Sequence, residues 1–304
     1  MTSHCLRQNN IIMNTIDTNT FKVTVPIALK NTATTCDLNA SEKKIEKALE
    51  HVREQLGEFQ NTIYAHGKYA VLICIQGMDT AGKDSMIREV FKDFNTRGIV
   101  VHSFKVPTEL ERNHDYLWRH YIALPARGKF SVFNRTHYEN VLVTRVHPEY
   151  VLGENLPDVN SVDDIDEAFW DKRFEQINNF ERHVAENGTI IFKFFLHLSK
   201  NEQKNRLLRR LHKADKNWKF SPDDLKERKL WSAYQDCYED AINRTSTSHA
   251  PWYVIPADNK PAARLIVANI LYQTLIEYKD IVEPELEEDI KVNLDQYIKE
   301  LEND

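Results

Sequence analysis

The chain has 304 residues, of which 41% are hydrophobic and 28% are charged, and its formal net charge is −6. This composition is typical of a globular protein with one good core. No stretch approaches the roughly 18 apolar residues of a membrane span, and the N-terminus lacks the apolar segment of a signal peptide. The four cysteines form no C-x-x-C pair, so neither a disulfide framework nor a zinc site is indicated. We therefore expect a cytoplasmic protein without a membrane partner.

The two ends of the chain differ in composition from its middle. Residues 1–20 are polar and rich in Asn and Thr, so we expect a disordered extension there. Asn39-Ala-Ser-Glu42 resembles a capping box and predicts a helix that runs to about Tyr64. We assign residues 21–280 to one domain and the acidic residues 281–304 to a C-terminal helix.

A glycine-rich loop stands between a predicted strand and a predicted helix. Tyr69 to Ile75 is an apolar run typical of a buried strand, and Asp84 to Phe94 has helical periodicity. The Gly-x-x-x-x-Gly-Lys spacing between them is that of a phosphate-binding P-loop. Backbone N–H groups and a helix N-terminus would face the phosphates, with Lys83 as a point charge for the terminal oxygens. We therefore predict a phosphate site at Gly77, Thr80, Ala81, Gly82, Lys83 and Asp84.

Two acidic residues distinguish this loop from the common one. Asp84 stands where Ser or Thr normally offers a hydroxyl to Mg²⁺, and Asp79 lies inside the loop. A carboxylate facing phosphates is tolerable if a metal ion lies between them, or if it accepts a proton or bond from an incoming group. Asp79 is thus a candidate metal ligand or base. The alternative is that it caps the helix or binds loop amides.

Strands and helices alternate along the remaining sequence. Apolar runs predict strands at 99–104, 129–133, 189–196 and 252–255. Helical patterns occur at about 111–122 and 164–186, and again from Lys200, Pro222 and Lys260 onwards. Such alternation predicts an α/β fold of three layers, a mostly parallel sheet with helices on both faces.

Basic residues gather in two parts of this acidic chain. Between Lys200 and Lys229 they outnumber acidic residues about two to one, and a second set consists of Lys105, Arg119, Arg127, Arg135 and Arg145. Either set can be a solvated face or can bind an anionic partner. Arg206 and Arg210 are four residues apart on one helix face, where like charges repel unless a counter-anion is present. Together with Arg135 they follow strands of the predicted sheet, so they can converge on its carboxyl edge.

The strand before Arg135 ends in an unusual residue. In P-loop folds the neighbouring apolar strand usually ends in an acid that binds Mg²⁺. Here the position is Asn134, whose amide oxygen can ligate or orient a metal-bound water but carries no charge. Asp79 must then carry more of the metal binding, or Glu139 must help.

Several motifs in correct order resemble polyphosphate kinase family 2. They are the loop Gly77–Asp84, Ser103–Thr108 with Leu117–Arg119, Phe133–His147, and Asn217–Phe220 through Pro251–Tyr253. The resemblance runs from about Phe21 to Tyr278. It implies a thymidylate-kinase-like core, a mobile helical lid at about 206–228, Mg²⁺ as cofactor, and phosphoryl transfer between inorganic polyphosphate and nucleotides. The Asn134–Glu139 stretch looks most like the subgroup that accepts both AMP and ADP.

The resemblance and the charge pattern together assign roles to individual residues. Catalytic roles are expected for Asp79, Lys83, Arg135, Arg206 and Arg210, with Asp79 and Asn134 at the metal. A polyphosphate track is expected along Lys105, Arg119, Arg145, Lys216 and Lys219. Nucleotide contacts are expected from Trp118, Asn134, Tyr138 and Glu139. The expected partners are polyphosphate, AMP, ADP and ATP and a second copy of the chain in a homo-oligomer, but not nucleic acid.

Two other functions remain open at this stage. An ATP-dependent nucleoside monophosphate kinase would share the loop, sheet and lid, although Asp84 counts against it. A non-catalytic nucleotide or polyphosphate sensor would explain Asn134 and Asp84 as signs of lost metal chemistry.

Overall fold

A five-stranded parallel sheet forms the centre of the protein. The computed structural model describes residues 16–214 and 217–304. The strands lie in the order β2-β3-β1-β4-β5; they are β1 (Ala70–Gln76), β2 (Ile99–Ser103), β3 (Phe130–Asn134), β4 (Thr189–His197) and β5 (Trp252–Pro256). All of β1 is buried and β4 is buried beyond its first residue. Strands covered on both faces are continuous apolar runs, which is why these two were predictable.

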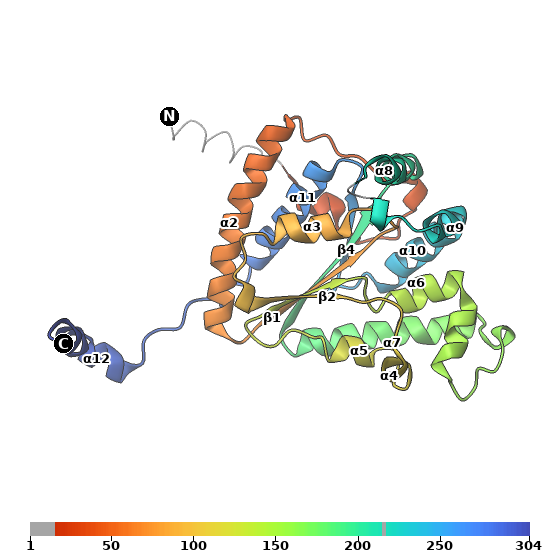
Figure 1. Ribbon diagram of the computed structural model, residues 1–304. Helices are drawn as coiled ribbons and strands as arrows, with labels where there is room; N and C mark the ends of the chain where they lie inside the picture. Colours follow the sequence, from red (N-terminus) through yellow and green to blue (C-terminus); the bar gives the residue numbers. More distant parts are fainter. Residues whose placement is uncertain (1–15, 215–216) are drawn as a thin grey trace.

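Helices cover both faces of the sheet (Figure 1). One layer contains α2 (Glu42–His66), α3 (Lys83–Val90) and α11 (Lys260–Leu275). The other contains α5 (Trp118–Tyr121), α6 (Glu139–Val146), α7 (Glu167–Glu186) and α10 (Trp231–Thr245), with α4 (Glu109–Arg112) beside it. Two further helices, α8 (Lys200–His212) and α9 (Asp223–Lys229), lie beyond the carboxyl edge of the strands (Figure 1). The predicted three-layer α/β/α architecture is confirmed.

Short 3₁₀ helices lie in the connections between these elements. They are η1 (Thr18–Phe21), η2 (Leu29–Asn31), η3 (Thr96–Gly98), η4 (Pro148–Glu154), η5 (Val162–Asp164) and η6 (Asn217–Lys219). The first of them corrects a prediction, because residues 16–20 are not disordered. Ile16 is buried in the same hydrophobic cluster as residues of α2, α3 and α11, and η1 begins two residues later. The rest of the expected extension, residues 1–15, lies outside the described residues.

Three helix predictions need correction. The predicted capping box is not formed. The N-cap of α2 is Ser41, whose side chain makes no capping hydrogen bond, and the helix begins at Glu42. Asn39 lies before the helix in a left-handed backbone conformation, with φ of 51°. The predicted helix at 111–122 is two short helices, α4 and α5. The helix α6 was not predicted, since its N-cap, Tyr138, provides no side-chain hydrogen bond that a sequence pattern would reveal.

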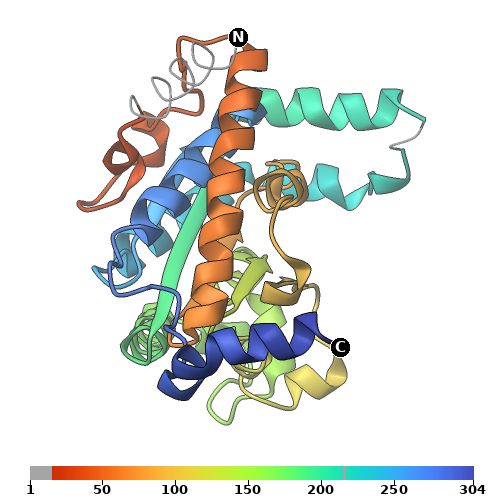
Figure 2. The ribbon, with the colours of Figure 1, turned by 90° about the vertical axis from the view of Figure 1, so that its left-hand side faces the viewer.

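The C-terminal segment forms a helix that stands apart from the sheet. This helix, α12 (Glu288–Glu302), is joined to the rest of the chain by an extended segment (Figures 1 and 2). None of the helices among the described residues is long and apolar enough to cross a membrane.

Candidate active site

The loop after β1 is held in a conformation that only small residues permit. Gly77 has φ of 154°, and a Cβ atom there would lie 3.0 Å from the Leu196 carbonyl oxygen. Thr80 and Gly82 also have positive φ, 65° and 107°. These turns bring the loop back onto the first turn of α3, which begins at Lys83. The loop therefore forms a ring that closes on a helix N-terminus, where backbone N–H groups can receive phosphate oxygens.

Lys83 lies inside this ring. Its ammonium donates to the Gly77 carbonyl at 2.6 Å and more weakly to that of Met78 at 3.4 Å. Burial, and then the nearby Arg135 guanidinium, lower the pKa of Lys83 from its usual value. Phosphate oxygens entering the loop would replace the carbonyl contacts and favour the charged form of this side chain.

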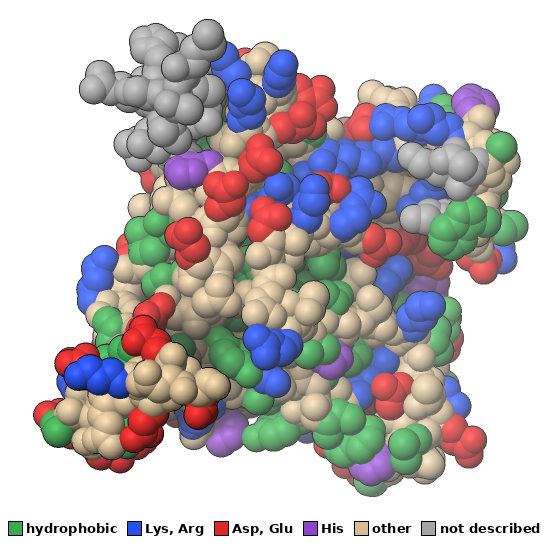
Figure 3. All heavy atoms as spheres, turned by 60° about the vertical axis from the view of Figure 1, so that its left-hand side comes forward, with side chains coloured by type: hydrophobic (Ala, Val, Ile, Leu, Met, Phe, Trp, Pro, Cys, Tyr) green, Lys and Arg blue, Asp and Glu red, His purple; other side chains and the backbone are tan. Residues whose placement is uncertain are grey.

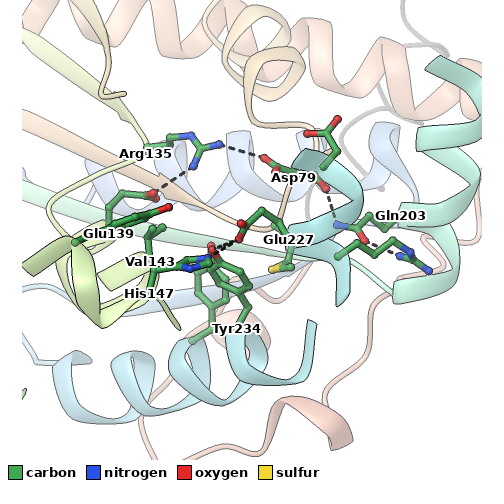
Figure 4. A pocket seen from close by; sticks show the side chains of 14 residues that line it. Asp79, Arg135, Glu139, Val143, His147, Gln203, Glu227 and Tyr234 are labelled. Carbon is green, nitrogen blue, oxygen red and sulfur yellow. Dashed lines mark hydrogen bonds and ion pairs between the residues drawn. The ribbon is translucent and has the colours of Figure 1, made fainter. Parts of the chain in front are cut away.

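Arg135 joins the loop to the next strand of the sheet. Its guanidinium donates to Asp79 at 3.1 Å and to Glu139 at 3.2 Å, so a cation lies between two carboxylates (Figure 4). The adjacent Glu139, and then Asp79, raise the pKa of Arg135. Its backbone has φ of 60°, a left-handed conformation that is uncommon for residues other than glycine. The strand end and Asp79 thus place a permanent positive charge over the phosphate loop.

A buried ionic network fixes the turn that carries Arg135. The Glu181 carboxylate, on α7, accepts hydrogen bonds from Lys193 at 2.6 Å and Tyr138 at 2.8 Å, and contacts His137 at 3.0 Å. All four side chains are fully buried. The Lys193 ammonium also donates to the Thr245 carbonyl at 2.7 Å, which adds α10 to the network. Buried charges are stable only when paired in this way, so the network holds the turn in one position.

Arg206 is hydrogen-bonded to the backbone of the loop. Its guanidinium donates to the carbonyls of Thr80 at 3.0 Å, Ala81 at 2.9 Å, Ala257 at 2.7 Å and Asp258 at 3.0 Å. The side chain is only 4% exposed. We expected Arg206 to face the transferred phosphate from a mobile lid, and this geometry differs: the guanidinium is committed to main-chain oxygens. Arg210, one turn further, forms an ion pair with Asp224 at 3.3 Å.

A cleft of about 170 Å³ opens beside the loop, lined by more residues than the sequence indicated. Asp79, Arg135 and Glu139 form one wall (Figure 4). The other lining residues are Gly77, Met78, Val143, His147, Tyr150, Gln203, Asp224, Glu227, Arg228, Tyr234 and Tyr238. Several of these residues come from α9 and α10, and they meet the loop only through helix packing. No local motif marked them.

Hydrogen bonds order the far side of the cleft. Glu227 accepts from the Tyr234 hydroxyl at 2.5 Å and contacts His147 at 3.1 Å (Figure 4). Gln203 donates to the Asp79 carbonyl at 3.1 Å and accepts from Arg228 at 2.6 Å. A chain of contacts therefore connects α9 to the phosphate loop through α8.

The cleft is rich in carboxylates. Burial, and then the charge of Asp79, raise the pKa of Asp224 from its usual value. Asp79, Glu139, Asp224 and Glu227 share the cleft with the cations Arg135 and Arg228. Repulsion between neighbouring carboxylates is relieved by a bound cation, so this cleft suits a ligand that arrives with a metal ion.

The residues predicted for a metal fit Mg²⁺ by their chemistry. Asn134 donates its amide N–H to Asp84 at 2.7 Å, so these two side chains lie together at the mouth of the loop. Mg²⁺ prefers carboxylate and amide oxygens, and it typically takes one or two of them together with water and substrate phosphates. Within the described residues no group of three or more His, Cys, Asp or Glu is placed to hold a metal ion. The carboxylate of Asp79 and the amide oxygen of Asn134 are donors of the kind that Mg²⁺ takes together with phosphate oxygens.

Cations gather on the other side of the loop. A small hollow there is lined by Gly82, Ser85, Lys260 and Arg264, from α3 and α11. Burial and the nearby Arg206, Arg209 and Arg264 lower the pKa of Lys260 to about 8. Figure 3 shows a band of Lys and Arg side chains across the upper part of this face. Lys260 and Arg264 had not been predicted as site residues.

Several predicted site residues lie elsewhere. Tyr138 is fully buried and donates to Glu181, so it cannot stack on a base. Arg119 is 7% exposed, donates to the Lys105 carbonyl and lies 5.4 Å from the Phe104 ring. Arg145 pairs with Asp240 and packs against Trp170 and Phe174. These three side chains are structural here, because packing and hydrogen bonds already use them.

The remaining predictions have mixed outcomes. Trp118 stacks on His114 with ring centroids 4.1 Å apart and does not line the cleft. Lys105 is exposed and lines neither the cleft nor the hollow beside Lys260, so its role in a polyphosphate track stays a prediction. Lys216 lies outside the described residues, and Lys219 belongs to η6.

Comparisons with known proteins agree on one family. The model of the family "Polyphosphate kinase 2 (PPK2)" matches residues 39–283. An ADP-polyphosphate phosphotransferase of Rhodopseudomonas palustris is 46% identical over 226 residues, which cover 74% of this chain and 77% of that protein. An AMP/ADP-polyphosphate phosphotransferase of Meiothermus ruber is 45% identical over 229 residues, 75% of this chain and 80% of that protein.

A solved structure extends this likeness to the fold. The crystal structure of polyphosphate kinase 2 from Arthrobacter aurescens TC1 superimposes with a TM-score of 0.83 at 32% identity, and covers 92% of this chain and 95% of that one. The fold, the phosphate loop and the matched sequence all lead to one conclusion. The chain belongs to the polyphosphate kinase 2 family.

Proposed function

We propose that this polyphosphate kinase transfers a phosphoryl group reversibly between inorganic polyphosphate and AMP or ADP, with Mg²⁺ as cofactor. The observation that carries the proposal is Arg135 between Asp79 and Glu139, beside the ring that holds Lys83. The names of the two relatives, an ADP-polyphosphate phosphotransferase of Rhodopseudomonas palustris and an AMP/ADP-polyphosphate phosphotransferase of Meiothermus ruber, support the choice of substrates. We also propose that the enzyme works in the cytoplasm as a homo-oligomer.

The nucleotide is assigned to the carboxylate-rich cleft. Its terminal phosphate would point to Arg135 and Lys83, while Tyr234, Tyr238 and Val143 offer apolar surface at the inner wall. Bound Mg²⁺ supplies positive charge between the phosphates and the carboxylates, and Asp79 and Asn134 are the residues that would hold it. Glu139 keeps Arg135 charged and oriented. The acceptor is thereby positioned next to the loop.

The polyphosphate is assigned to the cation-rich side of the loop. Lys260, Arg264 and Arg209 lie there, and the loop amides with Lys83 would hold the phosphate that is transferred. Attack by a terminal oxygen of the nucleotide on that phosphorus breaks the bond to the next phosphate of the chain. Positioning and fixed positive charge then carry most of the catalysis, because phosphoryl transfer needs little covalent help from the protein.

The test is a direct transfer assay with separated products. Purified protein, Mg²⁺ and polyphosphate are incubated with AMP, ADP, GMP or GDP singly, and the products are resolved by chromatography. The proposal expects ADP from AMP and ATP from ADP. Product formation with ATP as donor but not with polyphosphate would favour a nucleoside monophosphate kinase. Binding of both ligands without any transfer would favour a sensor.

A further inference from the structure

Within the described residues, the C-terminal helix α12 makes no hydrogen bond or ion pair with the body of its own chain. Its hydrogen bonds and ion pairs, such as Lys291 to Glu285 at 2.7 Å, all stay within residues 285–304 of the described chain. None of its residues is buried. Figures 1 and 2 show the helix joined to the body only by the preceding extended segment. A 15-residue helix is marginal in water by itself, so its stability requires a partner.

One face of α12 is apolar. The apolar stripe consists of Ile290, Leu294, Tyr297, Ile298 and Leu301, which are 37–77% exposed. Ile290, Leu294, Tyr297 and Leu301 follow one another at spacings of four, three and four residues, so they lie on one line along the helix. Val292 is the exception, because it points to the opposite face and is 75% exposed. Such a stripe is the usual mark of a helix that packs on another surface.

A second uncovered apolar surface lies at the edge of the sheet. The strand β2 is the last in the order and pairs only with β3. Val100 is 48% exposed and Val101 is 47% exposed, and their side chains point to opposite faces of the sheet. Proteins normally protect an exposed apolar edge strand by covering it or by charging it. The β2 strand contains no Asp, Glu, Lys or Arg, and its two valines remain about half exposed in the described part of the chain.

The charges of the two surfaces are complementary. In residues 281–304 acidic residues outnumber basic ones by nine to two. Two cations lie near the beginning of the β2 edge: Arg97 stands two residues before β2, and Lys129 directly precedes the paired strand β3. The helix is long enough to cover the strand, since 15 helical residues span about 22 Å and a five-residue strand spans about 16 Å.

We propose that α12 docks its apolar stripe on the β2 edge of a second copy of this chain. The extended segment carries α12 outward from its own sheet (Figure 1), which directs the stripe to another molecule. Pairing of α12 with another α12 would instead bring two strongly acidic segments together. Exchange of both helices across a two-fold axis gives a closed dimer in which each β2 edge is covered. The inference concerns assembly and is independent of the proposed activity.

The first experiment measures the mass of the full chain by light scattering after gel filtration, at several concentrations. We expect wild type at twice the 35.7 kDa mass of one chain. Leu294→Glu charges the stripe and should shift the protein to the single-chain mass. Val292→Glu makes the same change on the opposite face and should leave the dimer intact. A wild-type monomer, or a Leu294→Glu dimer as stable as wild type, would overturn the proposal.

The second experiment identifies the surface on which α12 docks. A chain carrying Leu294→Cys is mixed with a differently tagged chain carrying Val101→Cys and oxidised, because a disulfide forms only where Cα atoms approach to about 6 Å. We expect mixed-tag dimers at several times the level seen with wild type, whose own cysteines give the background. A Leu294→Cys chain that joins only to itself would show paired α12 helices. A chain with both changes that closes on itself would show docking within one molecule. Either result contradicts the proposal.

Discussion

The two sides of the phosphate loop have opposite electrostatic character. On one side, Asp79, Glu139, Asp224 and Glu227 line a cleft in which carboxylates outnumber cations. On the other, burial and then the surrounding cations lower the pKa of Lys260. A bare polyanion is repelled by the first surface and attracted by the second. One loop can therefore bind two anionic substrates on its two sides. The substrate on the carboxylate-lined side needs a metal ion, whereas the substrate on the cationic side does not.

The largest expected effect is at the residue where the two sides meet. Asp79→Asn removes a charge that faces both the cleft and Arg135, so turnover should fall on the order of a thousandfold or more. Folding, followed by circular dichroism, should be unchanged because Asp79 is partly exposed. Asp223→Asn is the matched control, since this exposed carboxylate pairs only locally with Lys226. Near-normal turnover in Asp79→Asn would remove this residue from the mechanism.

A pair of variants tests whether the two sides bind different substrates. Lys260→Ala should raise the KM for polyphosphate roughly tenfold with little change in kcat, because the contact is equal in ground and transition states. Glu227→Gln should instead raise the KM for the nucleotide, since it disturbs Tyr234 and His147. Added salt should shrink the Lys260→Ala defect, because screening also weakens the wild-type contact. Exchanged phenotypes would mean that the two substrates have been assigned to the wrong sides.

The pH dependence of polyphosphate binding gives a smaller signal from the same cation. Lys260, with a pKa of about 8 in the folded protein, is charged below that value and loses its proton as the pH rises through it. In wild type, kcat/KM for polyphosphate should therefore fall a few-fold between about pH 7 and pH 9. Lys260→Arg keeps its charge over this range and should flatten the profile. An equal decline in both proteins would assign the titration to another group.

The smallest effect is expected at the mouth of the loop. Asn134→Asp adds a negative charge beside the proposed metal, so the Mg²⁺ concentration for half-maximal rate should fall about two- to fivefold. The added carboxylate would also face Asp84, to which Asn134 now donates a hydrogen bond at 2.7 Å. Measuring the Mg²⁺ titration in Asp84→Asn as well separates these contributions. Identical titrations in wild type and Asn134→Asp would place the ion elsewhere.

The sheet and the phosphate loop were predictable because their signals are local. Buried parallel strands are short apolar runs, and the loop has fixed glycine spacing, so each can be identified without knowledge of its neighbours. The family resemblance supplied the expected substrates from motifs distributed over most of the chain, and the family is confirmed.

The rest of the site depends on packing that no single segment encodes. Glu227 and Tyr234 reach the loop through the docking of α9 and α10, and neither stands in a recognisable motif. Arg206 looked like a free cation because sequence does not show the carbonyls that surround its guanidinium. Tyr138 is close to Arg135 in sequence, yet the turn between them sends one side chain to the core and the other to the cleft. Side-chain direction in such a turn follows from backbone conformation rather than residue type.

The contacts of Arg206 also set a limit on motion. Its guanidinium ties the middle of α8 to the phosphate loop and to the segment after β5 through four main-chain carbonyls. Moving this part of α8 would leave the buried guanidinium without its hydrogen-bond partners, at a cost of several kcal/mol. The phosphate loop, this part of α8 and the segment after β5 should therefore move as one rigid unit when substrates bind.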